Sequence, residues 1–394
     1  MLDALFWVFS VPAVAAAMQS LRAGRRYWRA VAHGMDAAPV DWTPPASLIV
    51  PVKGFEEGLA ENLRSLLEQD YPDFEVLVVA QDSQDPAVER ILPLLGDRGR
   101  LVVAGAGRGD TGEKINNLLA GVSEARASSE VLVFADSDGK VEPGWLQALI
   151  APLRDANVGA ATGYRWYFSE RGEAGSLLRT VWNSTIAGTF GVGRPHFAWG
   201  GATAIRRETF RAARLPVYWL GAVSDDYRLS EAIQAAGLQI RFTPRAMVAS
   251  EGECSLREFF GWATRQMIIT RVYRPQLWWP GFLSHLFYCG AMTTGVLRIA
   301  GGEFWVSPIL LLVMLPGMWR GELRRRAAQR MFPNRRAWFD RYGWIYFWLA
   351  VPVCWTWLAV FLASGWRRRI EWRGNIYELL GRSRTRPLSA IPRR

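Results

Sequence analysis

Two aspartates, Asp136 and Asp138, stand one residue apart directly after an apolar stretch at positions 131–135. The stretch is typical of a buried β-strand, and open α/β folds bind ligands at the carboxyl edge of such strands. Two hard oxygen donors at this spacing can hold Mg²⁺ or Mn²⁺, and the ion would neutralise a departing diphosphate. Acidic turns followed by glycine are common, so it is the position after the strand that favours a metal–diphosphate site.

A second acidic pair, Asp225 and Asp226, precedes a helix-like stretch at 229–235. A carboxylate held near a substrate hydroxyl can remove its proton as the hydroxyl attacks, which is general-base catalysis. We expect both aspartates in the catalytic site, with Asp226 as the base. The alternative is a pair of acids that stabilises a helix start, and for Asp225 both interpretations can hold.

Acidic residues also follow the strand-like stretch at 74–80. Asp82 is expected to accept hydrogen bonds from a uracil or a ribose. Asp85 is interpreted as the cap of a helix that begins at Pro86.

Cations and amides at other element ends suit the phosphates or hydroxyls of a donor substrate. Lys53 follows the strand-like stretch 46–52, and Lys114 and Asn117 lie at the start of a helix-like stretch, 113–123. Donor contact is the expected role of these three residues. A solvated helix start is the alternative for Lys114 and Asn117.

A loop containing Trp199, Gly200 and Gly201 lies between the two acidic pairs. Paired glycines allow close backbone approach, and an aromatic ring offers a stacking face for a sugar or a lipid. We therefore expect an acceptor-binding loop. The neighbouring His196 is interpreted as structural and is left out of the catalytic set.

The elements that must position these residues alternate between strand and helix patterns. This alternation predicts an α/β domain over 46–258, with a mostly parallel sheet covered by helices on both faces. The expected strands are 46–52, 74–80, 101–104 and 131–135, and the expected helices are 59–68, 86–95 and 113–123.

Apolar stretches flank this domain in the 394-residue chain, whose net charge is +11. We expect a membrane helix at 1–21, a basic linker at 22–45, an amphipathic interfacial segment at 259–275, membrane segments within 276–366 and a basic cytoplasmic tail at 367–394. The basic loop 320–341 and the tail both carry the cytoplasmic signature, so either Pro352 breaks the last segment or one segment lies in the interface. Arginines beside tryptophan-rich stretches indicate a lipid surface, not nucleic acid, as the partner.

Several of these motifs together resemble the ceramide glucosyltransferase family, glycosyltransferase family 21, and its bacterial relatives within the family 2-like group. The resemblance covers most of the chain and is carried by the stretches 79–87, 114–118, 136–138 and 225–227. It implies a GT-A fold, a UDP-sugar donor, inversion at the anomeric carbon and a sphingolipid-type acceptor.

Carried over by position, Asp82 is similar to the family aspartate near the nucleotide, and Asp136 and Asp138 to the metal–diphosphate element. Asp226 is similar to the general base. The last family motif, a Gln or Arg, two variable residues and then Arg-Trp, falls on Arg265 and Gln266, with Arg271 nearby, but the Arg-Trp pair is missing here. This difference argues against a processive polysaccharide synthase.

The resemblance therefore leads us to expect transfer of a hexose, glucose above all, from a UDP-sugar to ceramide or a similar sphingolipid. Mg²⁺ or Mn²⁺ would be the cofactor, and the domain would face the cytoplasm at a bacterial inner membrane. The alternatives are another lipid acceptor, such as a polyprenyl phosphate, diacylglycerol or a hopanoid, or a catalytically silent membrane scaffold.

Overall fold

A computed structural model describes residues 2–38, 40–190 and 197–390, and the chain divides into two compact units. The helical unit comprises Met1–Met35, Phe168–Gly193 and Glu253–Arg367. The sheet unit comprises Asp36–Tyr167, Arg194–Gly252 and Arg368–Arg394.

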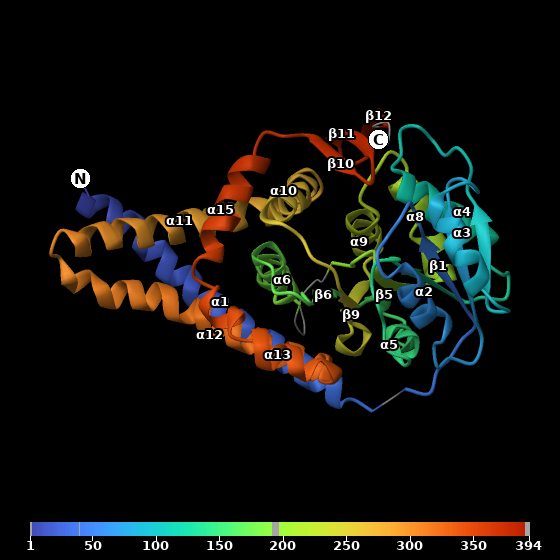
Figure 1. Ribbon diagram of the computed structural model, residues 1–394, viewed down its shortest axis with the longest axis horizontal. Helices are drawn as coiled ribbons and strands as arrows, with labels where there is room; N and C mark the ends of the chain where they lie inside the picture. Colours follow the sequence, from blue (N-terminus) through green and yellow to red (C-terminus); the bar gives the residue numbers. More distant parts are fainter. Residues whose placement is uncertain (1, 39, 191–196, 391–394) are drawn as a thin grey trace. The chain divides into compact units, whose positions relative to one another are not determined.

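The sheet unit is built on a seven-stranded sheet of order β3-β2-β1-β4-β7-β5-β8. Figure 1 labels two of its strands, β1 and β5, among the helices α2, α3, α4 and α5. Strands β1, β2, β3 and β4 run parallel, whereas β7 is antiparallel to both of its neighbours. The strands are β1 (Ala46–Pro51), β2 (Phe74–Ala80), β3 (Gly99–Val103), β4 (Val131–Ala135), β5 (Val158–Thr162), β7 (Ala202–Arg206) and β8 (Gln239–Phe242). A small parallel pair, β6 (Arg165–Tyr167) and β9 (Val248–Ser250), lies outside this sheet.

Helices cover both faces of the sheet because successive side chains of its strands point to opposite sides. On one face, Leu48 and Val133 belong to a core with buried residues of α2 (Leu59–Leu67), α3 (Pro86–Ile91) and α5 (Trp145–Ile150). On the other face, Gly121 of α4 (Glu113–Glu124) lies against Ile49, and Phe134 packs on Trp219 of α8 (Leu215–Trp219). The remaining helices here are α7 (Arg207–Ala212), α9 (Asp225–Ala235), η1 (Leu92–Leu94), η2 (Ala151–Arg154) and η3 (Pro244–Ala246).

The expected α/β architecture is confirmed, and the strands at 74–80 and 131–135 begin and end where the sequence pattern placed them. The helix expected over 86–95 is shorter: its α-helical part ends at Ile91, and a 3₁₀ turn with Pro93 follows. Proline has no amide hydrogen for the helical ladder, which is the physical reason.

The helical unit contains the long helices of the chain. Two stretches, Leu2–Asp36 and Phe304–Met331, are long and apolar enough to cross a membrane. Its helices are α1 (Leu2–Asp36), α6 (Ala174–Ala187), α10 (Leu256–Tyr273), α11 (Pro275–Ala300), η4 (Phe304–Val306), α12 (Ser307–Met331), η5 (Pro333–Arg335), α13 (Arg336–Tyr342), α14 (Ile345–Trp348) and α15 (Val353–Ser364).

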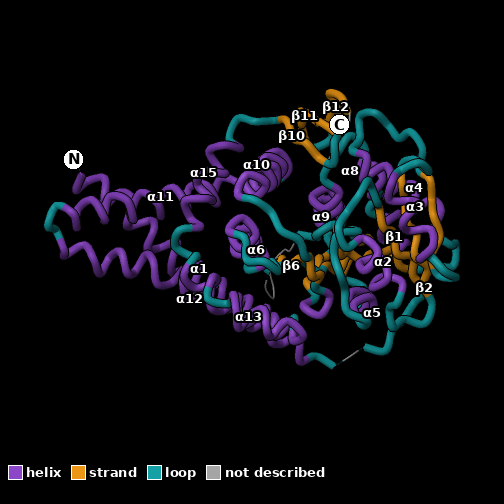
Figure 2. Tube along the Cα trace, viewed as in Figure 1, coloured by secondary structure: helices purple, strands orange, loops and turns teal. Residues whose placement is uncertain are grey.

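This organisation differs from the expected domain division in three places. The linker expected over 22–45 is wrong for its first part, because α1 continues as helix to Asp36. The stretch that contains α6 clusters with the membrane-type helices, not with the sheet. The expected tail folds into a three-stranded antiparallel sheet of the sheet unit, made of β10 (Arg369–Trp372), β11 (Asn375–Gly381) and β12 (Arg384–Ala390), drawn in orange in Figure 2.

The last apolar segment, 342–366, is not one continuous helix. Helix α14 ends at Trp348, and α15 begins at Val353, directly after Pro352. The interruption lies at the proline that the sequence analysis singled out as a helix breaker.

Candidate functional site

Lys114 lies at the centre of the acidic residues of the sheet unit. Its Nζ is 2.8 Å from Oδ1 of Asp136 and 3.2 Å from Oδ2 of Asp225. Asp136 follows β4, Asp225 opens α9, and Lys114 is in the first turn of α4, so three elements meet at this ammonium group. The two acidic motifs, about ninety residues apart in sequence, are thereby joined into one site.

Burial and charge together set the protonation of this cluster. Burial alone would lower the pKa of Lys114, but the Asp136 and Asp225 carboxylates outweigh it and raise that pKa, so the amine stays charged. Burial raises the pKa of Asp225 to about 6; Lys114 opposes this shift, while Asp226 and Asp136 add to it. The pair Asp225 and Asp226 therefore titrates as a coupled unit.

Asp226 keeps one carboxylate oxygen available. Its Oδ1 accepts from the Ser224 hydroxyl and, at 2.7 Å, from the Tyr227 amide, whereas no described residue hydrogen-bonds to its Oδ2. Burial raises the pKa of this carboxyl, against the opposing effect of the Ser224 hydrogen bond. Asp225 is 4% exposed and paired with Lys114, so of the two aspartates Asp226 is the better placed to accept a proton from a substrate.

The paired glycines allow the loop before β7 to lie directly against these carboxylates. A Cβ at Gly200 would come within 2.0 Å of Oδ2 of Asp225, and a Cβ at Gly201 within 2.6 Å of Oδ2 of Asp136. The glycines are thus required for close packing onto the acidic cluster. Acceptor binding by Gly200 and Gly201 remains a prediction.

Trp199, the third expected acceptor residue, packs inside the sheet unit. Its ring meets that of Tyr164 edge to face at 5.8 Å, and the Arg165 guanidinium lies 5.0 Å from the ring centroid. Its side chain is partly buried against the core of the sheet. If Trp199 stacks on a sugar or a lipid, it would use the face of the ring that Tyr164 and Arg165 leave uncovered.

Arg165 of β6 binds both candidate metal ligands. Its Nη2 is 3.2 Å from Oδ2 of Asp136, and its Nη1 donates to Oδ2 of Asp138 at 2.8 Å. Burial raises the pKa of Asp138, but Arg165, Arg373 and Lys114 together lower it below its ordinary value, so this carboxyl stays ionised. The two carboxylates have the hard oxygens that a divalent ion needs, and no group of three or more acidic, His or Cys ligands occurs among the described residues. Asp136 and Asp138 would be the residues that hold such an ion.

The tail sheet contributes to the neighbourhood of Lys53. Lys53 forms an ion pair with Glu113. The Asn375 amide donates to Oε2 of Glu113 at 2.6 Å, and the Tyr377 hydroxyl accepts from the Glu113 backbone amide at 3.2 Å. Strand β11 therefore fixes the carboxylate that holds this lysine.

A hairpin turn of the tail sheet contacts the loop that contains Lys53 and Glu56. Arg373 and Gly374 connect β10 to β11, and both have positive φ, 47° and 80°, as a two-residue hairpin turn requires. The Arg373 guanidinium pairs with Glu56 and donates to the Lys53 carbonyl at 3.3 Å. Glu56 in turn accepts from the hydroxyl of Ser137 at 2.5 Å. Ser137 is the residue between the candidate metal ligands Asp136 and Asp138.

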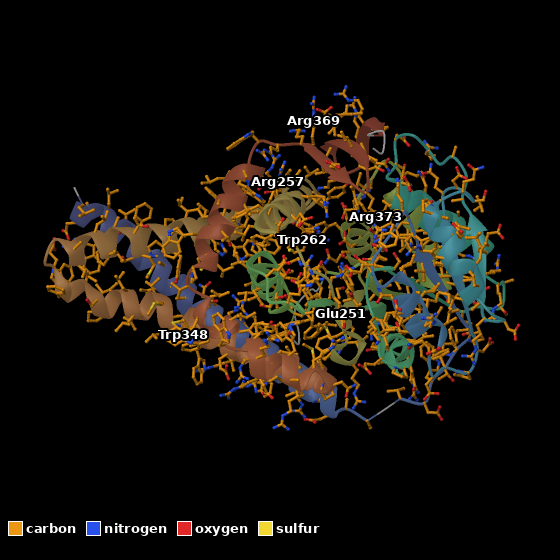
Figure 3. The ribbon with its side chains drawn as sticks, viewed as in Figure 1. Glu251, Arg257, Trp262, Trp348, Arg369 and Arg373 are labelled. Carbon is orange, nitrogen blue, oxygen red and sulfur yellow. The ribbon has the colours of Figure 1, made fainter. Side chains whose placement is uncertain are left out.

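Figure 3 labels Arg373 together with Arg369 of the same tail sheet. The Arg369 side chain is 71% exposed, compared with 31% for Arg373. Arg373 therefore faces the acidic residues of the sheet unit, whereas Arg369 is mainly solvated.

Asp82, Asp85 and Asn117 lie outside the Lys114 cluster. The exposed Asp82 accepts from the Gln84 backbone amide, and no hydrogen bond or ion pair joins it to the other candidate site residues that are described. Asp85 caps α3 through the Ala87 amide and also accepts from the Gly54 amide at 2.7 Å, which ties the Lys53 loop to this helix. Asn117 is 2% exposed, and no described group bonds to its Oδ1. Donor contact by Asp82 and Asn117 remains a prediction.

The predicted residues of the variant family motif belong to the helical unit. Arg265, Gln266 and Arg271 all lie on α10. Arg271 donates from Nε to the Ser364 carbonyl at 3.0 Å, at the end of α15, so one of its contacts is structural. Their nucleotide-binding role remains a prediction, and His196 lies outside the described residues.

A family model for glycosyl transferase family 21 matches residues 5–384, which is nearly the whole chain. The chain belongs to this family. It is therefore a glycosyltransferase, and the mostly parallel sheet with its acidic strand ends is a GT-A domain.

One solved structure has a similar fold, and one curated relative matches part of the chain. The mannosyltransferase PcManGT from Pyrobaculum calidifontis, solved with GDP-Man and Mn²⁺, is 18% identical and aligns with a TM-score of 0.51 over 93% of this chain and 98% of its own. The O-antigen biosynthesis protein RfbC of Myxococcus xanthus is 37% identical over 134 residues, 34% of this chain. The matched region spans 10% of that relative's length.

Four site residues were absent from the sequence-based set: Glu56, Glu113, Arg165 and Arg373. Glu113 precedes Lys114 and was within reach of the motif analysis. Arg165 carried no usable signal, since a single arginine has no spacing to identify it. Arg373 lies in the stretch 372–377, which resembles an element that follows the membrane segments in related enzymes, and this resemblance could have pointed to it.

Arg373→Ala should weaken donor binding of this glycosyltransferase. The substitution removes charge-assisted hydrogen bonds to Glu56 and to the Lys53 carbonyl, so we expect the donor KM to rise about tenfold or more. Steady-state kinetics with varied donor concentration measure this KM. Arg369→Ala, on the same tail sheet but exposed, is the matched control. Equal KM values for both variants would contradict a role of Arg373 in donor binding.

Proposed function

We propose that this family 21 glycosyltransferase is a membrane-bound inverting enzyme that transfers a hexose, glucose in the first instance, from a UDP-sugar to a lipid hydroxyl. Ceramide or a similar sphingolipid is the proposed acceptor. The observation that carries the proposal is the cluster of Asp136, Lys114 and Asp225 beside Asp226, whose Oδ2 is open.

Asp226 is the proposed general base. Its Oδ2 would accept the proton of the acceptor hydroxyl as the hydroxyl oxygen attacks the anomeric carbon and the bond to the diphosphate breaks. A single displacement of this kind inverts the anomeric configuration. Lys114 holds Asp225 in place beside this base and keeps the negative charge of the pair balanced.

Asp136 and Asp138 would hold the divalent ion, which supplies positive charge to the departing diphosphate. The GDP-Man and Mn²⁺ in the PcManGT structure support a nucleotide-sugar donor and a metal for this chain too. Lys53 and Arg373 lie near the same edge of the sheet, where each is held by a carboxylate, Glu113 and Glu56 respectively.

A lipid acceptor is supported by the helical unit. Two of its helices are long and apolar enough to span a membrane. Exposed tryptophans are a further feature of this unit, as expected where aromatic rings meet the headgroup region: Trp7, Trp279, Trp305, Trp319, Trp344, Trp348, Trp355 and Trp366.

Label transfer in a lipid environment tests the proposal. The purified chain in lipid nanodiscs would receive radiolabelled UDP-glucose and, in separate reactions, ceramide, diacylglycerol, a hopanoid or a polyprenyl phosphate. We expect label in ceramide. Label in another lipid alone would overturn the proposed acceptor and keep the glycosyltransferase activity. Competition with unlabelled UDP-hexoses tests which sugar the enzyme accepts from the donor.

The pH dependence of kcat/KM should show an acidic limb near pH 6. Asp225 has a pKa of about 6 and is coupled to Asp226, whose pKa is also raised. Both pKa values lie above the ordinary Asp value, so the base becomes protonated, and activity falls, as the pH drops through this range. Initial rates at subsaturating donor and acceptor concentrations measure this limb. A rate that stays constant down to about pH 4.5, close to the ordinary pKa of a carboxyl group, would contradict the predicted limb.

A further inference from the structure

Arg324 is a buried cation without a partner in the described part of the chain. Arg324 is 3% exposed, its buried Nε has no hydrogen-bond partner, and no described carboxylate forms an ion pair with it. An isolated buried charge is strongly unfavourable, whereas buried arginines are ordinarily paired and hydrogen-bonded. We therefore expect an anionic partner beside Arg324.

Another buried arginine of the same unit shows the ordinary arrangement. Arg298 is 5% exposed and forms ion pairs with both Asp3 and Glu303. Where this unit buries an arginine between its own helices, it can supply carboxylates. At Arg324 it supplies none.

A second arginine adds to the positive charge at the same place. Arg320 precedes Arg324 by four residues, so both lie on one face of α12, where like charges repel. Arg320 donates to the Ser20 hydroxyl at 2.8 Å and to the Gly188 carbonyl at 3.5 Å, and no described carboxylate pairs with it.

The surrounding elements do not neutralise this pair of arginines. Glu322, the acid nearest in sequence, bonds to Arg325 and Arg326 instead. A Cβ at Gly188, at the end of α6, would lie 3.3 Å from Cδ of Arg324 and 3.5 Å from Nη2 of Arg320, so this helix end contacts both arginines. The partial charge of about −0.5 at a helix C-terminus is well short of two positive charges.

We propose that Arg320 and Arg324 form a binding site for a phosphate group, and that the phosphate is the headgroup of an anionic lipid. Guanidinium groups match phosphate oxygens with paired, charge-assisted hydrogen bonds. A lipid is favoured over a free ion because Arg320 is the first charged residue after the apolar part of the Phe304–Met331 helix, the level at which headgroups meet a spanning helix.

Thermal unfolding in lipid nanodiscs tests the site without any sugar donor, so its outcome is separate from the proposed function. The parent chain is compared with Arg324→Met in phosphatidylcholine alone and in phosphatidylcholine mixed with phosphatidylglycerol. We expect phosphatidylglycerol to raise the Tm of the parent by several degrees, on the order of 5 °C, and to leave that of Arg324→Met unchanged. In phosphatidylcholine alone, Arg324→Met should be at least as stable as the parent, because the unpaired buried charge is gone.

Arg326→Met is the matched control, since Arg326 lies on the same helix but is half exposed and bonded to Glu322. It should keep the full response to phosphatidylglycerol. If Arg324→Met does not fold, Arg320→Gln and Arg324→Lys take its place; the first should lose most of the response, and the second should retain part of it.

Two outcomes would overturn the proposal. An equal response of parent and Arg324→Met to phosphatidylglycerol would show that the lipid acts elsewhere. A full rise in Tm with inorganic phosphate in phosphatidylcholine nanodiscs, at constant ionic strength, would make the ligand a soluble anion and reject the lipid headgroup. Phosphatidylglycerol retained on the parent but not on Arg324→Met in native mass spectrometry would support it directly.

Discussion

Asp226→Asn should lower kcat by about a thousandfold, within the range that a positioned general base contributes. The amide cannot take a proton from the acceptor hydroxyl. Its oxygen can still accept from the Ser224 hydroxyl and from the Tyr227 amide, so the start of α9 should be preserved. Single-turnover transfer of labelled sugar measures the loss, and equilibrium binding of UDP should be unchanged.

Asp97→Asn makes the same chemical change at an exposed position of the sheet unit and should have parental kcat. The base assignment would be wrong if Asp226→Asn turned over like this control. A matching loss of UDP affinity would instead show that Asp226 serves the donor site.

Lys114→Gln should destabilise the sheet unit and impair catalysis. The substitution removes the ammonium that is paired with Asp136 and Asp225, whose side chains are 22% and 5% exposed. Breaking one side of such a buried network costs about 3–5 kcal/mol, and we expect the lower end because Asp136 is partly solvated. Denaturant unfolding in detergent measures the loss of unfolding free energy.

The same variant should change the pH profile. Lys114 lowers the pKa of both Asp225 and Asp226, so its removal raises these pKa values and moves the acidic limb of kcat/KM to higher pH. Lys140→Gln, at an exposed lysine, is the control for stability and pH profile alike. An unshifted limb in Lys114→Gln would mean that this lysine does not govern the pair.

The strands and their acidic ends could be read from the sequence because they are local. An apolar run such as 131–135 predicts a buried strand, and the parallel arrangement predicts that polar residues at strand ends share one edge. The pairing of Lys114 with both Asp136 and Asp225 was not predictable, since each residue comes from a different element and only the fold joins them.

Gly200 and Gly201 show how the sequence can predict a steric requirement without identifying the groups that impose it. Adjacent Gly200 and Gly201 indicated close backbone approach, and the structure shows that what approaches is the acidic cluster itself, with the Asp225 and Asp136 oxygens occupying the space of a side chain. Sequence composition could identify the steric requirement but not its partner.

By itself, the sequence determined the α/β domain, its acidic motifs and the apolar character of the long helices, because periodicity and short motifs act over a few residues; the GT-A type of that domain came from the family resemblance. The tertiary structure alone decided that the basic tail folds back as a sheet whose Arg373 holds Glu56, and that Arg324 is buried without a carboxylate. Both are properties of charges brought together from distant positions. Whether a charge is paired depends on its neighbours in space, which no local pattern records.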